Sequence, residues 1–291
     1  MLGVIGDIAQ DVVVWLKEEM RPATDTASAI GTGRGGSAAN VAAFAGPRHP
    51  TRFIGCVGED MAAPVVVRDL ETRGVDVRTQ VRGSTAMIVV LIDAEGERSM
   101  FPSRGASGMI EPVPEEWLKG LEILHVTGYS LQGEPSASSV LEAARTVKEA
   151  GGEISFDVSS AGMIDHYGRE RFQQMMVELA PDFVSANGQE SGYLGLTAGD
   201  GVGPLLERLP GTMLLVRAGT EPTRIFHGGE LLTDVPVTPA QEVLDMTGAG
   251  DAFNAGFLTG VLAGADLKRA CADGHDLART VLAHRGASDG T

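Results

Sequence analysis

Short apolar runs alternate along the chain with longer stretches in which apolar residues recur every three or four positions. The apolar runs predict buried strands at residues 2–6, 52–57, 123–126, 154–157, 183–186 and 213–216. The amphipathic stretches predict helices at residues 37–45, 63–73, 136–150, 169–179, 203–209, 251–263 and 267–283. Strands that alternate with helices in this way are typical of a parallel, doubly wound α/β sheet.

Two segments, roughly residues 12–30 and 79–101, interrupt this rhythm because they are rich in strand patterns and poor in helix patterns. Within the second, a predicted strand at 85–92 turns at DAEGE and pairs back with residues 98–101. We expect the two segments to form a small β-sheet beside the main sheet. The residues GTGRGG that follow the first segment are expected to form a glycine-rich loop before the helix at 37–45.

Composition narrows the class of protein without identifying it. The chain has 291 residues, 43% apolar and 21% charged, as expected for one large soluble domain. Its net charge is −16, and no cluster of Lys and Arg offers a surface for DNA or RNA. We find no signal-peptide pattern and no apolar run near the ~18 residues that span a membrane. Cys56 and Cys271 lie in no metal-binding spacing, so we expect reduced thiols and a cytoplasmic protein.

The segment DMTGAGD, from Asp245 to Asp251, is the strongest candidate for chemistry. Small residues let backbone N–H groups converge, and a helix that begins there directs its positive end at the same point. A carboxylate beside such an anion hole is suited to take a proton from a hydroxyl during phosphoryl transfer. The alternative is a plain strand-to-helix turn with Asp251 as the helix cap, but the full run, with a strand-like lead-in at residues 242–244, weakens it.

The longer run DMTGAGDAFNAGF resembles the D-T-x-G-A-G-D-x-F signature of the PfkB/ribokinase family of carbohydrate kinases, with Met246 where Thr often stands. The resemblance implies a single domain, 1–291, with a ribokinase-like three-layer α/β/α fold and a mostly parallel sheet. It implies that Asp251 is the catalytic base and that Gly248, Ala249 and Gly250 form the anion hole. The small β-sheet would be a lid, which in many relatives also forms a homodimer.

A second run, Gly35-Gly36-Ser37-Ala38-Ala39-Asn40, is similar to the family's G-G-x-x-x-N-x-A and implies contact with a sugar. Paired glycines allow the backbone to approach hydroxyl groups, and Asn40 offers both a donor and an acceptor. Some ribokinases carry Lys where this chain has Ser37, so ribose specificity is not favoured.

Two more residues are candidates for the substrate side of the site. In the family an Asp after the first strand binds substrate hydroxyls; Asp11 fits that position best, and Asp7 is the alternative. Arg104 could contact a substrate anion or the transferring phosphate, or could be an ordinary loop arginine.

The resemblance also implies a nucleotide side. Asn187 and Glu190 match the family's N-x-x-E, which is associated with Mg²⁺ and phosphate, although a helix-capping motif has the same pattern. Arg217 is a candidate phosphate contact. Gly219 begins the family's nucleotide-contacting G-x-x-G, in which Pro222 here replaces the second glycine and removes a donor.

Two weaker assignments rest on the family alone. His275 falls on a helix that lies against adenine in relatives, although a histidine on a helix face is commonly structural. Asp245 and Thr247 match positions that bind a monovalent cation in many relatives, so K⁺ dependence is a hypothesis.

We therefore expect an ATP- and Mg²⁺-dependent kinase that phosphorylates a hydroxymethyl group of a small sugar of the ribose, fructose or keto-deoxy type. A nucleoside kinase of the same fold is the main alternative, and a catalytically weak binding or regulatory homologue is another. A dinucleotide-dependent dehydrogenase is excluded, because GDIAQD and no G-x-G-x-x-G turn follows the first strand.

Overall fold

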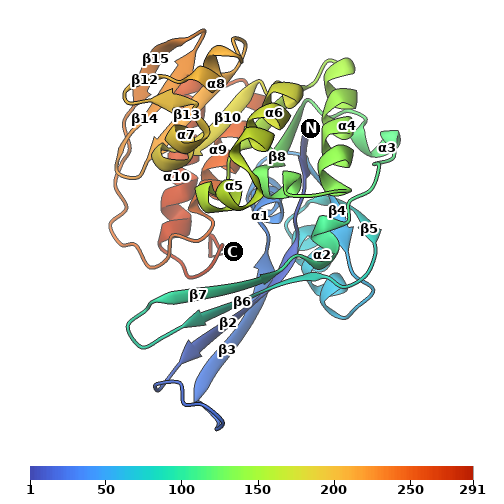
Figure 1. Ribbon diagram of the computed structural model, residues 1–291, viewed down its shortest axis with the longest axis vertical. Helices are drawn as coiled ribbons and strands as arrows, with labels where there is room; N and C mark the ends of the chain where they lie inside the picture. The colour runs from blue at the N-terminus through green and yellow to red at the C-terminus, as the bar shows by residue number, and fades with distance from the viewer. Residues whose placement is uncertain (291) are drawn as a thin grey trace.

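The computed structural model describes residues 1–290 and has a large central sheet with helices on both faces (Figure 1). The sheet has nine strands in the order β15-β14-β13-β10-β9-β8-β1-β4-β5. Their bounds are β1 Leu2–Ile5, β4 Thr51–Val57, β5 Asp76–Val81, β8 Ile123–Thr127, β9 Glu153–Asp157, β10 Phe183–Asn187, β13 Met213–Ala218, β14 Glu221–His227 and β15 Glu230–Val235. All neighbours pair in parallel except β13 with β14 and β14 with β15.

Two helical layers cover the sheet. One face packs against α1 Ser37–Ala45, α2 Ala62–Thr72, α9 Ala249–Leu262 and α10 Leu267–Leu282. The other packs against α4 Ser136–Glu149, α5 Ala161–Tyr167, α6 Arg169–Leu179, α7 Gly188–Leu194 and α8 Pro204–Glu207. Short elements complete the body: α3 Glu115–Leu118, the 3-10 turns η1 Gly105–Gly108 and η2 Gly128–Leu131, and a β11 Thr197–Ala198 and β12 Gly201–Val202 ribbon. In residues 1–290 no helix is long and apolar enough to cross a membrane.

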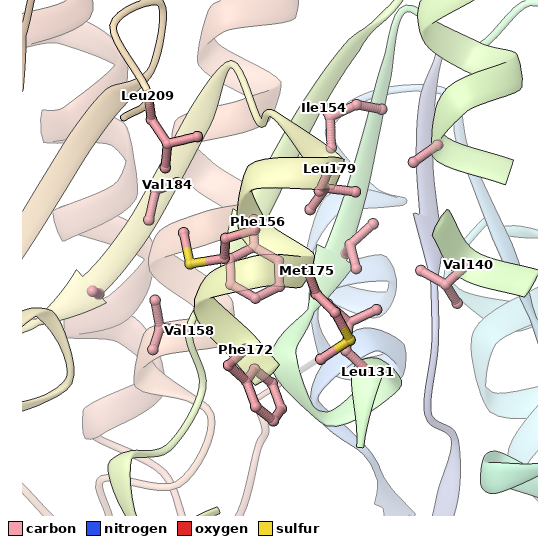
Figure 2. Packing of buried hydrophobic residues seen from close by; sticks show 14 of the residues in the cluster. Leu131, Val140, Ile154, Phe156, Val158, Phe172, Met175, Leu179, Val184 and Leu209 are labelled. Atoms are coloured by element: carbon pink, nitrogen blue, oxygen red, sulfur yellow. The ribbon is translucent and has the colours of Figure 1, made fainter. Parts of the chain in front are cut away.

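Alternating side chains divide the core into two halves. In β13, Leu214 and Val216 pack against the helices of the layer α4 to α8. Leu215 packs against the layer formed by α1, α2, α9 and α10. Successive residues of a strand point to opposite faces, so a continuous apolar run fits a strand that is buried on both sides. Figure 2 shows the first half, where Phe156 and Phe172 lie among aliphatic side chains from the sheet and from α6. The predicted three-layer, doubly wound architecture is confirmed.

A separate sheet with the strand order β3-β2-β6-β7, which we call the small sheet, projects from one end of the body (Figure 1). It consists of β2 Ala9–Leu16, β3 Ser28–Gly35, β6 Ala86–Ile92 and β7 Arg98–Ser103. Both predicted segments contribute to it. Strands β2 and β6 run parallel, and β3 and β7 flank them antiparallel.

The expected glycine-rich loop GTGRGG is instead mostly strand, because residues up to Gly35 belong to β3. Gly31 lies under the Trp15 ring of β2, where an added Cβ would sit 3.1 Å from the indole. Gly35 leaves room for the Asp11 carboxylate, which a side chain at that position would overlap. The glycines therefore allow side chains of β2 to lie close to the β3 backbone. The contacts between the two paired strands outweigh the low strand propensity of glycine.

Other predicted boundaries also change. Residues 79–81 belong to β5 at the edge of the large sheet and not to the small sheet. The hairpin β14–β15 and helix α5 were not predicted. Residues 242–244, expected as a strand before the DMTGAGD segment, have no regular structure. Whether such a short segment forms a strand depends on pairing with a neighbouring strand, and the local sequence pattern says little about that pairing.

Candidate active site

A cavity of about 790 Å³ opens at the carboxyl ends of β1, β8, β9 and β10, beneath the small sheet. Strand order reverses beside β1, and ligands of open α/β sheets bind at such a point. Of the residues predicted from sequence, the cavity lining includes Asp11, Gly36, Asn40, Arg104, Asn187, Glu190, Arg217, Thr247, Gly248, Gly250 and Asp251. It does not include Gly35, Gly219, Asp245, Ala249 or His275.

Asp251 is not the cap of its own helix. Helix α9 begins at Ala249, after Gly248 with a left-handed φ of 80°, so Asp251 is the third helical residue. Its carboxylate faces α1. Oδ1 accepts a hydrogen bond from Ser37 Oγ at 2.7 Å, and Oδ2 accepts one from Asn40 Nδ2 at 2.8 Å. One donor on each oxygen fixes the carboxylate and leaves each oxygen further capacity to accept.

Burial raises the pKa of Asp251 to about 7. The two hydrogen bonds from Ser37 and Asn40 lower the pKa, and the nearby charges of Asp157 and Asp7 raise it. A carboxyl group that titrates near neutral pH can take up a proton and release it again, as a general base requires.

The start of α9 has the features of an anion site. Backbone N–H groups of the first turn have no helical partner, and the helix dipole is positive at this end. The Arg217 guanidinium lies against Gly250, where any side chain would overlap it. Gly250 therefore allows a permanent positive charge to approach the helix terminus, and the combination suits a phosphoryl group.

Arg217 is held by two carboxylates, of which sequence analysis selected Glu190 but not Asp157. Its Nη2 lies 3.0 Å from Asp157 Oδ1 and 3.8 Å from Glu190 Oε2. Asp157 Oδ1 also accepts from Asn254 Nδ2 at 3.0 Å. Asp157 is the last residue of a predicted strand, at the sheet edge where ligands bind in such folds. This position could have identified Asp157 as a candidate from the sequence.

Asn187 and Glu190 form a capping box at the start of α7, as the structural alternative predicted. The same Glu190 lines the cavity, and burial raises its pKa. Within residues 1–290 no cluster of three or more acidic, His or Cys side chains could enclose a metal ion. A single carboxylate such as Glu190 fits Mg²⁺, because this ion binds few protein oxygens and keeps water and phosphate ligands.

Asp7 and Asp11, the two candidates for binding hydroxyls, have different surroundings. Asp7 caps α1, because its carboxylate accepts from the backbone N–H groups of Ser37 at 2.8 Å and Ala38 at 3.2 Å. Asp11 lines the cavity from β2, and its Oδ1 is buried without a hydrogen-bond partner. Burial raises the Asp11 pKa to about 6. An unpaired buried acceptor is costly, so a hydroxyl donor from a ligand would satisfy it.

Arg104 lies between the small sheet and the body. Its Nη2 donates to the backbone carbonyl of Tyr129 at 2.8 Å, and burial lowers its pKa. The side chain lines the cavity together with Tyr129 and Tyr167. Its guanidinium has further donors that can reach a ligand in the cavity.

Asp245 is surrounded by donors. Oδ1 accepts from the Thr247 N–H at 2.8 Å and from Arg98 Nη1 of the small sheet at 2.7 Å, and Oδ2 accepts from the Gly286 N–H at 2.9 Å. Arg98 also donates to Thr247 Oγ1 at 3.0 Å. A K⁺ ion needs oxygen ligands, whereas this carboxylate already faces two N–H groups and a guanidinium. The arrangement does not fit a bound K⁺.

Gly219 and His275 do not line the cavity. Gly219 forms the turn between β13 and β14, with a φ of 65°. Pro222 follows in β14 beside an irregularity in the pairing, where its missing N–H is tolerated. His275 is buried, with Nε2 2.8 Å from Thr223 Oγ1, and its ring packs on Phe253.

Comparisons with known proteins agree with this geometry. The chain is 32% identical over 270 residues to the ATP-dependent ribose-1-phosphate kinase of Halopiger xanaduensis, covering 88% of this chain and 84% of that protein. It is 32% identical over 252 residues to the fructokinase of Vibrio alginolyticus, covering 80% and 78%.

A solved structure of a putative ribokinase II from E. coli, in complex with ATP and Mg²⁺, has the same fold. Its TM-score is 0.85 at 24% identity, covering 100% of this chain and 95% of that one. Residues 1–291 match the family described as pfkB family carbohydrate kinase. With the expected fold, the two signatures in one cavity and a match over its whole length, the chain belongs to the pfkB family of carbohydrate kinases.

Proposed function

We propose that the protein transfers the γ-phosphoryl group of ATP to a hydroxymethyl group of a small carbohydrate, with Asp251 as general base. The observation that carries the proposal is the Asp251 carboxylate, which is held on both oxygens beside the N-terminus of α9 in a covered cavity.

The chemistry follows from these residues. Asp251 accepts the proton of the attacking hydroxyl, and the amides of residues 248–250 with Arg217 stabilise the negative charge on the transferring group. Glu190 would hold Mg²⁺ through water, and ATP would supply the phosphoryl group when bound. The small sheet acts as a lid that excludes water and so limits hydrolysis of ATP.

Asp11, the Gly35–Gly36 backbone and Asn40 would bind the acceptor. The unpaired Asp11 Oδ1 supports a polyol, because a carboxylate accepts several hydroxyl groups. The named relatives act on ribose 1-phosphate and fructose, and either type of sugar fits this chemistry. A nucleoside is the second candidate, because the rings of Tyr129 and Tyr167 line the cavity and could stack on a base.

The outer face of the small sheet supports a homodimer. Phe101 of β7 is 59% exposed and lies beside the half-buried Val89, and Ile30 of β3 is 66% exposed and lies beside the half-buried Val14. A second copy would cover this apolar face. A reduced state for Cys56 and Cys271, both buried, agrees with a cytoplasmic enzyme.

A panel of acceptors tests the proposal. Purified protein is mixed with MgATP and a series of sugars, sugar phosphates and nucleosides, and ADP release is measured against a no-acceptor control. We expect at least one sugar-type acceptor to stimulate ADP release, and Asp251→Ala to abolish it. Stimulation by nucleosides alone would favour the second candidate, and none by any acceptor would favour a regulatory homologue.

A further inference from the structure

A buried arginine reaches the active site from behind, at the end of β3. The Arg34 side chain is only 4% exposed, and its Nε donates to Asp69 Oδ2 of α2 at 2.7 Å. Its Nη1 donates to Asn40 Oδ1, so Arg34 lies on the side of Asn40 away from Asp251. Arg34 belongs to the GTGRGG run, but none of the functional roles described above is assigned to it.

The chemistry of these neighbours allows only one orientation of the Asn40 amide. A guanidinium has donors and no acceptor, so the Asn40 atom that faces Arg34 must be the carbonyl oxygen. An ionised carboxylate has acceptors and no donor, so the atom that faces Asp251 must be the NH₂ group. A free asparagine can exchange these two groups by rotating its side-chain amide by half a turn.

We propose that Arg34 is a positioning residue that fixes the Asn40 amide so that its NH₂ group, and not its carbonyl, faces the Asp251 carboxylate. This inference rests on the proposed role of Asp251 as the base. Without Arg34, the amide can present its oxygen to Asp251, and one of the two donors that orient the carboxylate is lost.

The expected consequence for protonation has a definite sign. The hydrogen bond from Asn40 lowers the pKa of Asp251, against the larger effect of burial. Its loss raises that pKa further, so the low-pH limb of the rate profile moves to higher pH. The positive charge of Arg34 also acts on Asp251, and its removal moves the limb in the same direction. Asp7 and Asp157, the other charged groups that act on Asp251, stay in place. A general loss of stability would lower activity without moving this limb.

Kinetics of Arg34→Met test the inference, because methionine keeps the apolar stem and removes every donor. We expect kcat to fall about tenfold, as for a lost hydrogen bond that orients a reacting group, and the low-pH limb to move upward. In an Asn40→Ala background the same substitution should change kcat by less than about twofold, because the residue through which Arg34 acts is absent. Arg34→Lys keeps a donor and the positive charge and should recover part of the rate.

Arg52→Met is the matched control. Arg52 is similarly buried, 13% exposed, and its Nε donates to Asp76 at 2.7 Å, but it does not line the cavity. An equal loss of kcat for Arg34→Met with and without Asn40, or an unmoved low-pH limb, overturns the inference. If Arg34→Met does not fold, the same comparisons are made with Arg34→Leu, which also removes every donor. Full activity of Asp251→Asn would instead overturn the proposed function, so the two failures are distinguishable.

Discussion

Replacing Asp251 with asparagine separates the role of its charge from the role of its shape. Asparagine has almost the same size, and its amide can keep both contacts. The new amide oxygen accepts from Asn40 Nδ2, and the new NH₂ group donates to Ser37 Oγ, because a hydroxyl can rotate and accept. The fold and the binding of substrates should therefore persist, while the proton acceptor is lost. We expect kcat to fall by at least ~10²-fold with little change in KM.

The same variant should be more stable than the wild type at neutral pH. The Asp251 pKa rises from 3.8 to about 7 on folding, so the folded state holds a proton that the unfolded chain releases. Wild-type stability therefore decreases as pH rises from about 4 to 7. The difference between the two pKa values corresponds to at most about 4 kcal/mol at pH 8, and we expect about half, because Asp251 is only partly buried.

Two measurements check this reasoning. Steady-state ADP release gives kcat and KM for both proteins, and urea unfolding at pH 5 and pH 8 gives their stabilities. Between pH 8 and pH 5 the wild type should gain stability relative to Asp251→Asn, and at pH 8 the variant should be the more stable of the two. A variant with more than a tenth of the wild-type kcat, or with the same pH dependence of stability as the wild type, would refute the assignment.

Three further outcomes are expected. Gly250→Ala displaces the Arg217 guanidinium, so kcat should fall about tenfold in activity assays. The melting temperature measured by calorimetry should stay within a few degrees of the wild-type value. Wild-type rates should be equal in K⁺ and in tetramethylammonium buffers, because Arg98 donates a hydrogen bond to Asp245. The Arg98→Ala variant should become K⁺-dependent, and a wild type that needs K⁺ contradicts this expectation. Asp11→Asn should raise the KM for the acceptor about tenfold and leave the KM for ATP unchanged, and equal changes in both would remove Asp11 from the acceptor site.

The alternation of strands and helices could be predicted because each strand buried on both faces is a continuous apolar run. Asp251 and Asn40 could be selected because their motifs are long and local. The hydrogen bonds within the site could not be predicted, since their partners are distant along the chain: Ser37 lies 214 residues from Asp251, and Asn254 lies 97 from Asp157. Ser37 appeared only as a difference from ribokinases, whereas in the structure it donates to the Asp251 carboxylate.

The errors have a common physical origin. Strand β3 contains several glycines and reads as a loop, yet β2 supplies its backbone partners and the Trp15 ring that covers Gly31. Local propensity is weak against a complete hydrogen-bonded neighbour. For His275 the helix could be predicted, whereas the face on which it lies depends on how α10 packs against α9 and β14.

The contact of Trp15 with Gly31 gives the protein a built-in optical reporter. The chain has two tryptophans: Trp15 on β2 of the small sheet and Trp117 on α3 of the body. Trp117→Phe would leave one fluorophore, attached to the part of the molecule that covers the cavity. Its emission wavelength and quenching would then follow movement of the small sheet directly, on the millisecond timescale of stopped-flow mixing and without an added label.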